Sequence, residues 1–154
     1  MTRNALILAA AGGSVLLLAG AYVFQAMGYP PCAMCLWQRW PHAAAVVIGV
    51  LAVAIRGPVM PALGAFAAET TSAIGLYHTG VERDWWEGPA SCTGASGLGS
   101  AGDLLSVEGP RLVMCDQVSW ALGGVSMASW NAILSALLVV LWVLAARRSV
   151  SRVA

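Results

Sequence analysis

Four long apolar stretches restrict what this chain can fold into more than any other feature of its sequence. A helix of about 20 apolar residues crosses a bilayer core about 30 Å thick. Because lipid offers the backbone no hydrogen-bonding partners, such stretches cross it as helices. They cover about residues 5–24, 36–55, 59–78 and 127–146. The sequence therefore predicts an all-α membrane protein, a four-helix transmembrane bundle with two extracytoplasmic loops.

The composition supports this class of protein and excludes others. The chain is 59% hydrophobic and 10% charged, whereas about 25% of the residues in a soluble globular domain are charged. Its net charge of +1 is too small to indicate a nucleic-acid partner. We expect a single four-span membrane domain over residues 1–154, with outer loops over 25–35 and 79–126.

The distribution of arginine predicts the orientation of the bundle. An even number of spans places both termini on one side of the membrane, and that side holds five of the eight arginines. The positive-inside rule therefore places the termini in the cytoplasm. Both loops then face outward, which in a bacterial inner membrane is the oxidising, periplasmic side. Cleavage of residues 5–24 as a signal peptide is an alternative, although this apolar run is longer than usual for one.

All four cysteines lie in the two expected outer loops. Cys32 and Cys35 form a C-x-x-C pair, and 22 residues separate Cys92 from Cys115. Three interpretations are open: two structural disulfides, a zinc site, or two redox pairs that exchange electrons. A C-x-x-C disulfide closes a ring too small to stabilise a fold much. Structural zinc prefers two close-spaced ligand pairs, so we expect no metal site.

Arg39 follows the second cysteine of the C-x-x-C pair by four residues. If a helix begins near Cys35, the two side chains share a face one turn apart. Because proline disfavours a helix interior, the regular helix could instead begin near Pro41. In both cases the sulfurs lie at a helix N-terminus near a guanidinium, which favours the thiolate. The alternative is an arginine that only reaches for the membrane interface.

The residues around the cysteines resemble one known family. The stretch PCAMCLWQRWP, residues 31–41, followed by an apolar segment, resembles the DsbB family of disulfide bond formation proteins. YHTGVERDWWEGPASC, which ends at Cys92, and CDQVSWALGGVSMASWNA, which begins at Cys115, are also similar to its members. The resemblance implies a membrane oxidoreductase that reoxidises a periplasmic thioredoxin-fold thiol oxidase (DsbA-like). It passes the electrons to membrane quinone, either ubiquinone or menaquinone.

The resemblance also implies a role for each cysteine. The thiolate of the partner attacks the Cys92–Cys115 disulfide at Cys92. The freed Cys115 then exchanges with the Cys32–Cys35 disulfide through Cys32. Cys35 becomes a thiolate beside the quinone, forms a charge-transfer pair or an adduct with it, and passes two electrons on. Arg39 matches the family arginine that helps to bind the quinone head group.

Three further polar residues have two interpretations each. His78, at the outer end of the third stretch, either borders the quinone pocket and relays a proton or is an interfacial histidine without chemistry. The same choice applies to His42. A charged Glu69 within a span would be costly, and we expect a neutral carboxyl that is hydrogen-bonded across the bundle to a serine or threonine. The apolar patch DLLSV, residues 103–107, is expected to touch the membrane interface briefly.

Other functions stay open on the sequence. A non-enzymatic membrane subunit could carry the four cysteines as two structural disulfides. A DsbB paralogue dedicated to one substrate would share the same motifs. The vitamin K epoxide reductase family also combines a helical bundle, a quinone and a C-x-x-C. There the C-x-x-C lies near a later span, whereas here it precedes the second.

Overall fold

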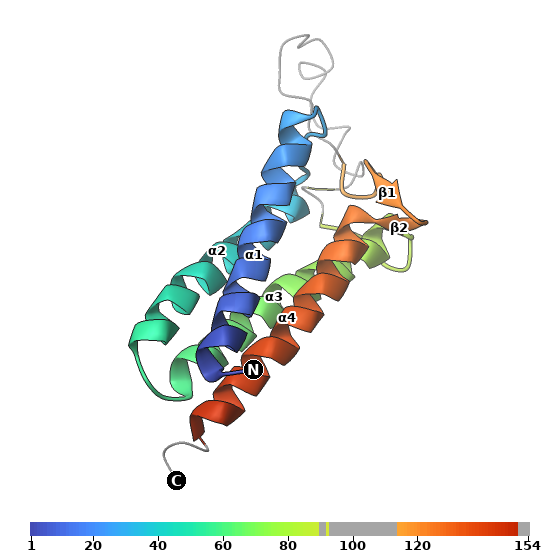
Figure 1. Cartoon of the computed structure of the whole chain (residues 1–154). Coiled ribbons are helices and arrows are strands. Elements are labelled where there is room, and N and C mark those ends of the chain that lie inside the picture. Colours follow the sequence, from blue (N-terminus) through green and yellow to red (C-terminus); the bar gives the residue numbers. More distant parts are fainter. Residues whose placement is uncertain (90–91, 93–113, 151–154) are drawn as a thin grey trace, which may run out of the picture.

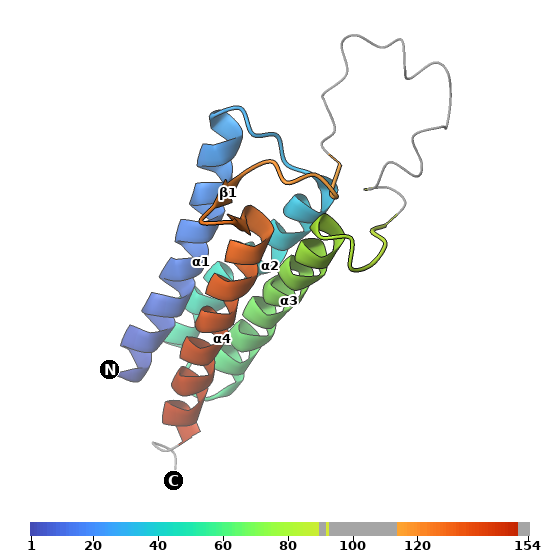
Figure 2. The same cartoon turned by 90° about the vertical axis from the view of Figure 1, so that its right-hand side faces the viewer.

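A bundle of four helices dominates the computed structural model, which describes residues 1–89, 92 and 114–150 (Figure 1). The helices are α1 (Arg3–Ala26), α2 (Ala33–Ala54), α3 (Val59–Glu82) and α4 (Met127–Val150). The N-terminus, the last turn of α4 and the α2–α3 turn lie at one end of the bundle, and the loop after α1 lies at the other (Figures 1 and 2). The DLLSV patch lies outside the described residues.

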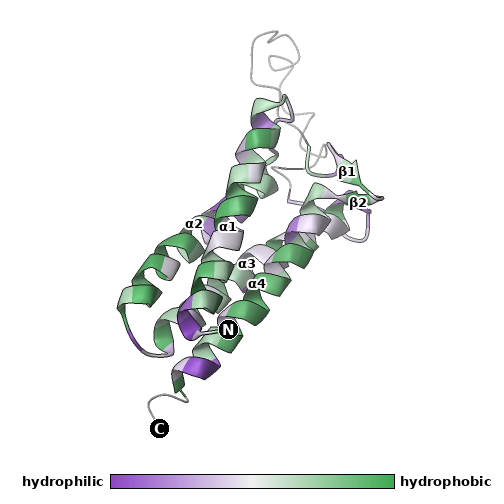
Figure 3. Ribbon diagram, in the orientation of Figure 1, coloured by the Kyte–Doolittle hydropathy of each residue, from purple (hydrophilic) through white to green (hydrophobic). Residues whose placement is uncertain are grey.

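Helices α1, α3 and α4 are long and apolar enough to cross a membrane. Large hydrophobic side chains are exposed on these helices, and apolar residues dominate the ribbon (Figure 3). Within the described residues, α2 is not among the candidate spans, because its first turns carry Gln38, Arg39 and His42. The prediction of four helices is therefore confirmed, and three of them can span a membrane. Crossing by α2, the orientation of the loops and the single membrane domain stay predictions.

A short hairpin, which was not predicted, precedes α4. Strands β1 (Ala121–Leu122) and β2 (Val125–Ser126) pair antiparallel. The turn between them is formed by Gly123 and Gly124, with φ of 62° and 76°. Two consecutive residues with positive φ are characteristic of the tight hairpin turn that twists in the same sense as its strands. The hairpin directs the chain from the outer loop into the first turn of α4.

Arg3 joins α1 to the rest of the bundle at the terminal end. Its guanidinium donates to Ser149 Oγ at 2.8 Å and to the carbonyls of Ile55 and Gly57 at 3.0 and 3.3 Å. These bonds link α1 to α4 and to the α2–α3 turn. Residues 5–24 are thus part of a helix packed into the bundle, as the four-helix prediction requires.

Small residues allow the helices to approach one another closely around Trp142. The indole of Trp142 is fully buried in the core. A Cβ built on Gly64 of α3 would lie 2.6 Å from this ring, and one on Gly49 of α2 would lie 2.4 Å from the Cβ of Ala11 in α1. Lipid provides no hydrophobic driving force between helices, so close van der Waals packing at small residues holds such bundles together.

Gly64→Ala is expected to lower the stability of the bundle by about 1–3 kcal/mol, which is typical of an overpacked core. The added methyl group would overlap the ring of Trp142, which is fully buried and cannot move away. Thermal unfolding in detergent would measure the effect. Gly20→Ala is the matched control, because nothing lies within 4 Å of a Cβ at that position of α1. Equal melting temperatures for the two variants would contradict the packing at Gly64.

Candidate active site

The C-x-x-C pair lies at the start of α2. Cys32 is the N-cap residue, and its Sγ accepts a hydrogen bond from the backbone N–H of Cys35 at 3.2 Å. The helix begins at Ala33, and Pro41 lies inside it. A helix start near Pro41 is therefore wrong, and the start near Cys35 is correct. Side-chain capping by Cys32 satisfies one of the N–H groups that every helix N-terminus leaves free.

The two cysteine pairs meet at this end of the bundle. Cys92 and Cys115 form a disulfide with a Cα–Cα distance of 5.2 Å, well within the usual range. The sulfur atoms of Cys32, Cys92 and Cys115 all lie within 4.8 Å of one another. Cys32 and Cys35 are free thiols whose sulfurs are 2.8 Å apart. A dithiol and a disulfide are thus adjacent, which is the arrangement required for thiol–disulfide exchange.

The two sulfurs of the C-x-x-C pair differ in acidity. The hydrogen bond from Cys32 lowers the pKa of the Cys35 thiol below its ordinary value, although burial opposes this. The same interaction, together with burial, raises the pKa of Cys32. Cys35 is therefore the sulfur that ionises first, and the thiolate is the reactive form of cysteine.

A pocket that is partly open to the surroundings lies beside Cys35. Its wall on the α1 side is apolar, with Leu17, Leu18 and Ala21. Its polar lining includes Cys35, Gln38, Arg39, His42, His78 and Asn131. The pocket thus brings together three of the six predicted site residues: Cys35, Arg39 and His78.

Arg39 lies against the end of α1. Its guanidinium donates to Gln25 Oε1 at 2.9 Å and to the Ala21 carbonyl at 3.5 Å, and it lies 4.6 Å from the centre of the Tyr22 ring. The Nε atom of Arg39 is buried and has no hydrogen-bond partner among the described residues. Arg39 is therefore held at the pocket with one donor unused, rather than extended freely into an interface.

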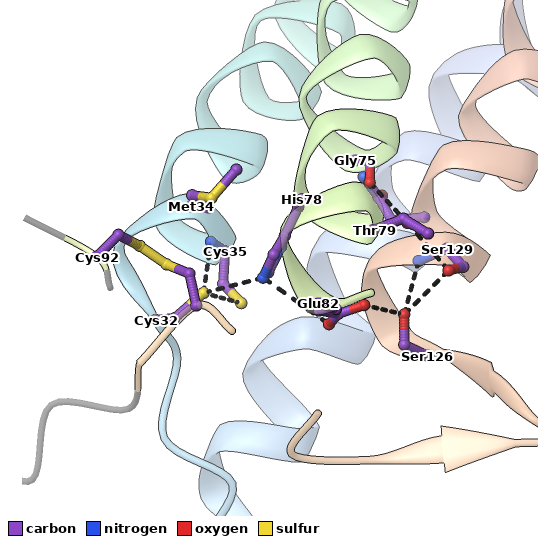
Figure 4. A network of polar contacts seen from close by, with 12 residues as sticks. Cys32, Met34, Cys35, Gly75, His78, Thr79, Glu82, Cys92, Ser126 and Ser129 are labelled. Carbon is purple, nitrogen blue, oxygen red and sulfur yellow. Dashed lines mark hydrogen bonds and ion pairs between the residues drawn. A yellow bond between two sulfur atoms is a disulfide. The ribbon is translucent and has the colours of Figure 1, made fainter. Parts of the chain in front are cut away.

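His78 links the C-x-x-C pair to a buried carboxyl group (Figure 4). Its Nε2 lies 3.6 Å from Cys32 Sγ and 3.8 Å from Oε1 of Glu82. Its Nδ1 lies 3.1 Å from Nε2 of Gln38. Glu82 in turn accepts a hydrogen bond from the hydroxyl of Ser126, in the hairpin. The side chain of His78 is buried, with 3% of its surface exposed. It therefore contacts Cys32 of the redox pair as well as the buried side chains of Gln38 and Glu82.

The other two polar residues considered in the sequence, His42 and Glu69, lie in different surroundings. His42 is buried, lines the pocket and lies with its Nε2 2.9 Å from Asn131 Oδ1. Glu69 is exposed on α3 and makes no hydrogen bond across the bundle to any residue that the structure describes. The expected bond from Glu69 to a serine or threonine is therefore wrong, because this position of α3 points away from the other helices.

Three residues of the site were not predicted: Gln38, Glu82 and Asn131. Gln38 is polar within an apolar stretch, and Glu82 follows His78 by four residues, so the sequence contained a signal for each. Asn131 gave no local signal, because its contacts to Gln38 and His42 come from a different helix.

A metal ion could also be held here. The ligand atoms of Cys32, Cys35 and His78 lie within 4.8 Å of one another. Zinc accepts this combination of sulfur and nitrogen ligands, although structural zinc sites use four. The remaining two cysteines are bonded to each other in this structure, so they do not offer the thiolates that zinc requires.

Comparison with known proteins identifies one family. The family model for "Disulfide bond formation protein DsbB" matches residues 3–145. "Disulfide bond formation protein B 2" of Pseudomonas aeruginosa strain PAO1 and "Disulfide bond formation protein B 1" of strain UCBPP-PA14 are each 27% identical, over 93% of this chain and 88% of the relative. No solved structure gives a significant match. Since the family match spans nearly the whole chain, the resemblance to this family is confirmed, and the chain belongs to the DsbB family of disulfide bond formation proteins.

Proposed function

We propose that this protein is a membrane protein-dithiol:quinone oxidoreductase that reoxidises a periplasmic thioredoxin-fold dithiol protein (DsbA-like). One observation carries the proposal. Cys35 lines a partly open pocket, while its neighbour Cys32 lies within 4.8 Å of the sulfurs of the Cys92–Cys115 disulfide. Electrons can therefore pass from one cysteine pair to the other and then to an acceptor in the pocket. Membership of the DsbB family supports the same direction of electron flow.

The lining of the pocket fits a quinone head group. An apolar wall on α1 suits the ring, and the guanidinium of Arg39, which lines the pocket, suits an oxygen that gains negative charge. A bound quinone, ubiquinone or menaquinone, would supply the oxidant by accepting two electrons and two protons. A planar guanidinium is suited to such oxygens because its donors are permanently charged and fixed in direction.

The cysteines carry out two linked reactions. In the first, the Cys115 thiolate, freed by the partner at Cys92, attacks Cys32. The Cys32–Cys35 bond breaks, a Cys32–Cys115 bond forms, and Cys35 leaves as a thiolate. The second thiol of the partner then attacks the mixed disulfide and leaves as a disulfide, and the freed Cys92 thiolate attacks Cys115. The Cys92–Cys115 bond forms again, the Cys32–Cys115 bond breaks, and Cys32 leaves as a thiolate. In the second reaction, the Cys32–Cys35 pair would be oxidised to a disulfide, and its two electrons would pass to a bound quinone that also takes up two protons. The low pKa of Cys35 favours it as the leaving sulfur in the first reaction.

The proposal includes the placement of the protein in a bacterial inner membrane. All four helices, including α2, cross the membrane, both termini are cytoplasmic, and the cysteine loops are periplasmic. The apolar surfaces of α1, α3 and α4 support insertion. The N-terminus and the last turn of α4 lie at one end of the bundle (Figure 1), and the four cysteine sulfurs cluster away from it at the start of α2.

An anaerobic assay tests the proposal. Purified protein is mixed with a reduced thioredoxin-fold dithiol protein and a short-chain quinone, the quinone absorbance is followed, and mixed disulfides are trapped for mass spectrometry. We expect catalytic quinone reduction and a mixed disulfide at Cys92. Retention of all four cysteines as disulfides, with no loss of quinone, would instead support a structural role.

The same assay separates redox chemistry from zinc binding. If the cysteines act as redox pairs, adding a chelator leaves the rate of quinone reduction unchanged. If Cys32, Cys35 and His78 hold zinc, the purified protein contains the metal and its C-x-x-C thiols react only after chelation.

A further inference from the structure

A buried network of polar side chains joins α2, α3 and α4 next to the redox pair. Gln38 of α2 lies between His78 of α3 and Asn131 of α4. Asn131 also contacts Thr71 of α3 and His42 of α2. An amide has a donor end and an acceptor end, and the orientation of each amide is determined by the partners that it must satisfy. The network therefore determines where the histidines carry their protons.

The orientation of the Gln38 amide follows from a backbone carbonyl. Its Nε2 lies 3.2 Å from the carbonyl oxygen of Met34, which can only accept. Turning the amide round would place two oxygens at this distance. Its Oε1 then accepts a hydrogen bond from Nδ2 of Asn131 at 2.6 Å. The second proton on Nε2 of Gln38 is therefore directed at Nδ1 of His78, 3.1 Å away.

The orientation of Asn131 follows from a second backbone carbonyl. The hydroxyl of Thr71 donates to the carbonyl oxygen of Gln38 at 3.1 Å, so the Thr71 oxygen is left as an acceptor. Nδ2 of Asn131 lies 3.2 Å from that oxygen and donates to it. Oδ1 of Asn131 then accepts from Nε2 of His42 at 2.9 Å. The carbonyl of Met34 orients the amide of Gln38, and the carbonyl of Gln38, through Thr71, orients the amide of Asn131. Both orientations agree with the bond from Asn131 Nδ2 to Gln38 Oε1.

This arrangement determines the proton on His78. Because Gln38 donates to Nδ1, that nitrogen must be unprotonated, and the proton of the neutral ring is on Nε2. Protonation of both nitrogens would direct two donors at each other across the contact of 3.1 Å between Gln38 and His78. We propose that Gln38 and Asn131 are positioning residues that hold His78 as the neutral Nε2–H tautomer, so that His78 donates a hydrogen bond to the Cys32 sulfur. The importance of this bond for exchange between the cysteine pairs rests on the proposed function.

The surroundings of Nε2 suit a donor. Cys32 Sγ lies at 3.6 Å and Oε1 of Glu82 at 3.8 Å. Both atoms can accept a hydrogen bond. The neutral ring therefore stabilises Cys32 as a thiolate and does not remove its proton. This role differs from both interpretations of His78 that the sequence left open, a proton relay and an interfacial histidine without chemistry.

Nitrogen NMR of the full-length protein, labelled with ¹⁵N in detergent, tests the tautomer directly. The chain has two histidines, and the orientation of Asn131 requires the Nε2–H form for His42 as well. Near neutral pH we expect two unprotonated Nδ1 signals and two protonated Nε2 signals. A protonated Nδ1 on His78 would overturn the proposal, and one on His42 would overturn the orientation of Asn131 on which it depends. This measurement uses neither quinone nor partner, so it is independent of the proposed function.

A second test measures the acidity of Cys32. Alkylation of Cys32 is followed against pH in the Cys35→Ser protein, with and without Gln38→Leu. Loss of the Gln38 donor frees the proton to move to Nδ1, so the alkylation midpoint is expected to rise and the rate near neutral pH to fall about tenfold. An equal maximum rate at high pH would show that access to Cys32 is unchanged.

Ser72→Ala is the matched control for this second test. It removes a hydrogen bond of 2.9 Å from α3 to the Ala132 carbonyl of α4 that does not involve His78. We expect no shift of the Cys32 midpoint in this variant. An equal shift in Ser72→Ala and Gln38→Leu, or no shift in Gln38→Leu, would contradict the role of Gln38.

Discussion

Replacement of Cys35 by serine is expected to abolish quinone reduction, with the steady-state rate falling at least about a thousandfold. A serine hydroxyl does not ionise near neutral pH, and it cannot form a disulfide with Cys32. The variant therefore has no group beside the pocket that can release an electron pair. The measurement is the loss of quinone absorbance under anaerobic conditions with an excess of reduced thioredoxin-fold partner.

Cys92→Ser is the matched control for Cys35→Ser. It removes the sulfur that is proposed to meet the partner, but it keeps Cys32 and Cys35 beside the pocket. After chemical reduction, this variant is expected to reduce one equivalent of quinone and then to stop, without oxidising the partner. Cys35→Ser is expected to show the reverse: a mixed disulfide with the partner and no quinone reduction. Repeated turnover of quinone by Cys35→Ser would refute the proposed path.

Arg39→Ala is expected to weaken the use of quinone about 10–100-fold in kcat/KM, while exchange between the two cysteine pairs stays close to the wild-type rate. A hydrogen bond to a charged group contributes about 1.5–3 kcal/mol, which corresponds to this range. The guanidinium lines the pocket, and its hydrogen bonds go to Gln25 and Ala21. Its charge contributes least among the causes that shift the pKa of Cys35. Quinone titrations and rapid-mixing measurements of disulfide exchange would separate the two effects.

Arg39→Lys distinguishes charge from geometry at the same position. Lysine keeps the positive charge but lacks the planar arrangement of donors, so we expect an intermediate kcat/KM for quinone. A Gln25→Ala variant removes the side chain that holds the guanidinium at 2.9 Å, and it should raise the KM for quinone less than Arg39→Ala does. A wild-type rate for Arg39→Ala at every quinone concentration would show that Arg39 does not bind quinone.

The start of α2 shows how far local patterns could be followed. The apolar pattern placed the second stretch at 36–55, whereas the helix runs from Ala33 to Ala54. The earlier start comes from capping by Cys32, which a hydropathy pattern does not register. The hairpin before α4 was missed, although Gly123–Gly124 between apolar residues is a common signal for a two-residue turn. Because this signal lies within the long loop expected over residues 79–126, the sequence pattern predicted no strands there.

The sequence by itself determined the number of helices, the apolar character of at least three of them, and the presence of a C-x-x-C pair at a helix start with an arginine one turn later. These properties depend on residues close together in the chain, because helix length and capping are local. Only the tertiary structure decided that the two cysteine pairs meet, and that Gln38 and Asn131 orient His78. Those contacts join residues up to 93 positions apart. They form only when packing of the small residues brings four helices together, and no local pattern encodes that distance.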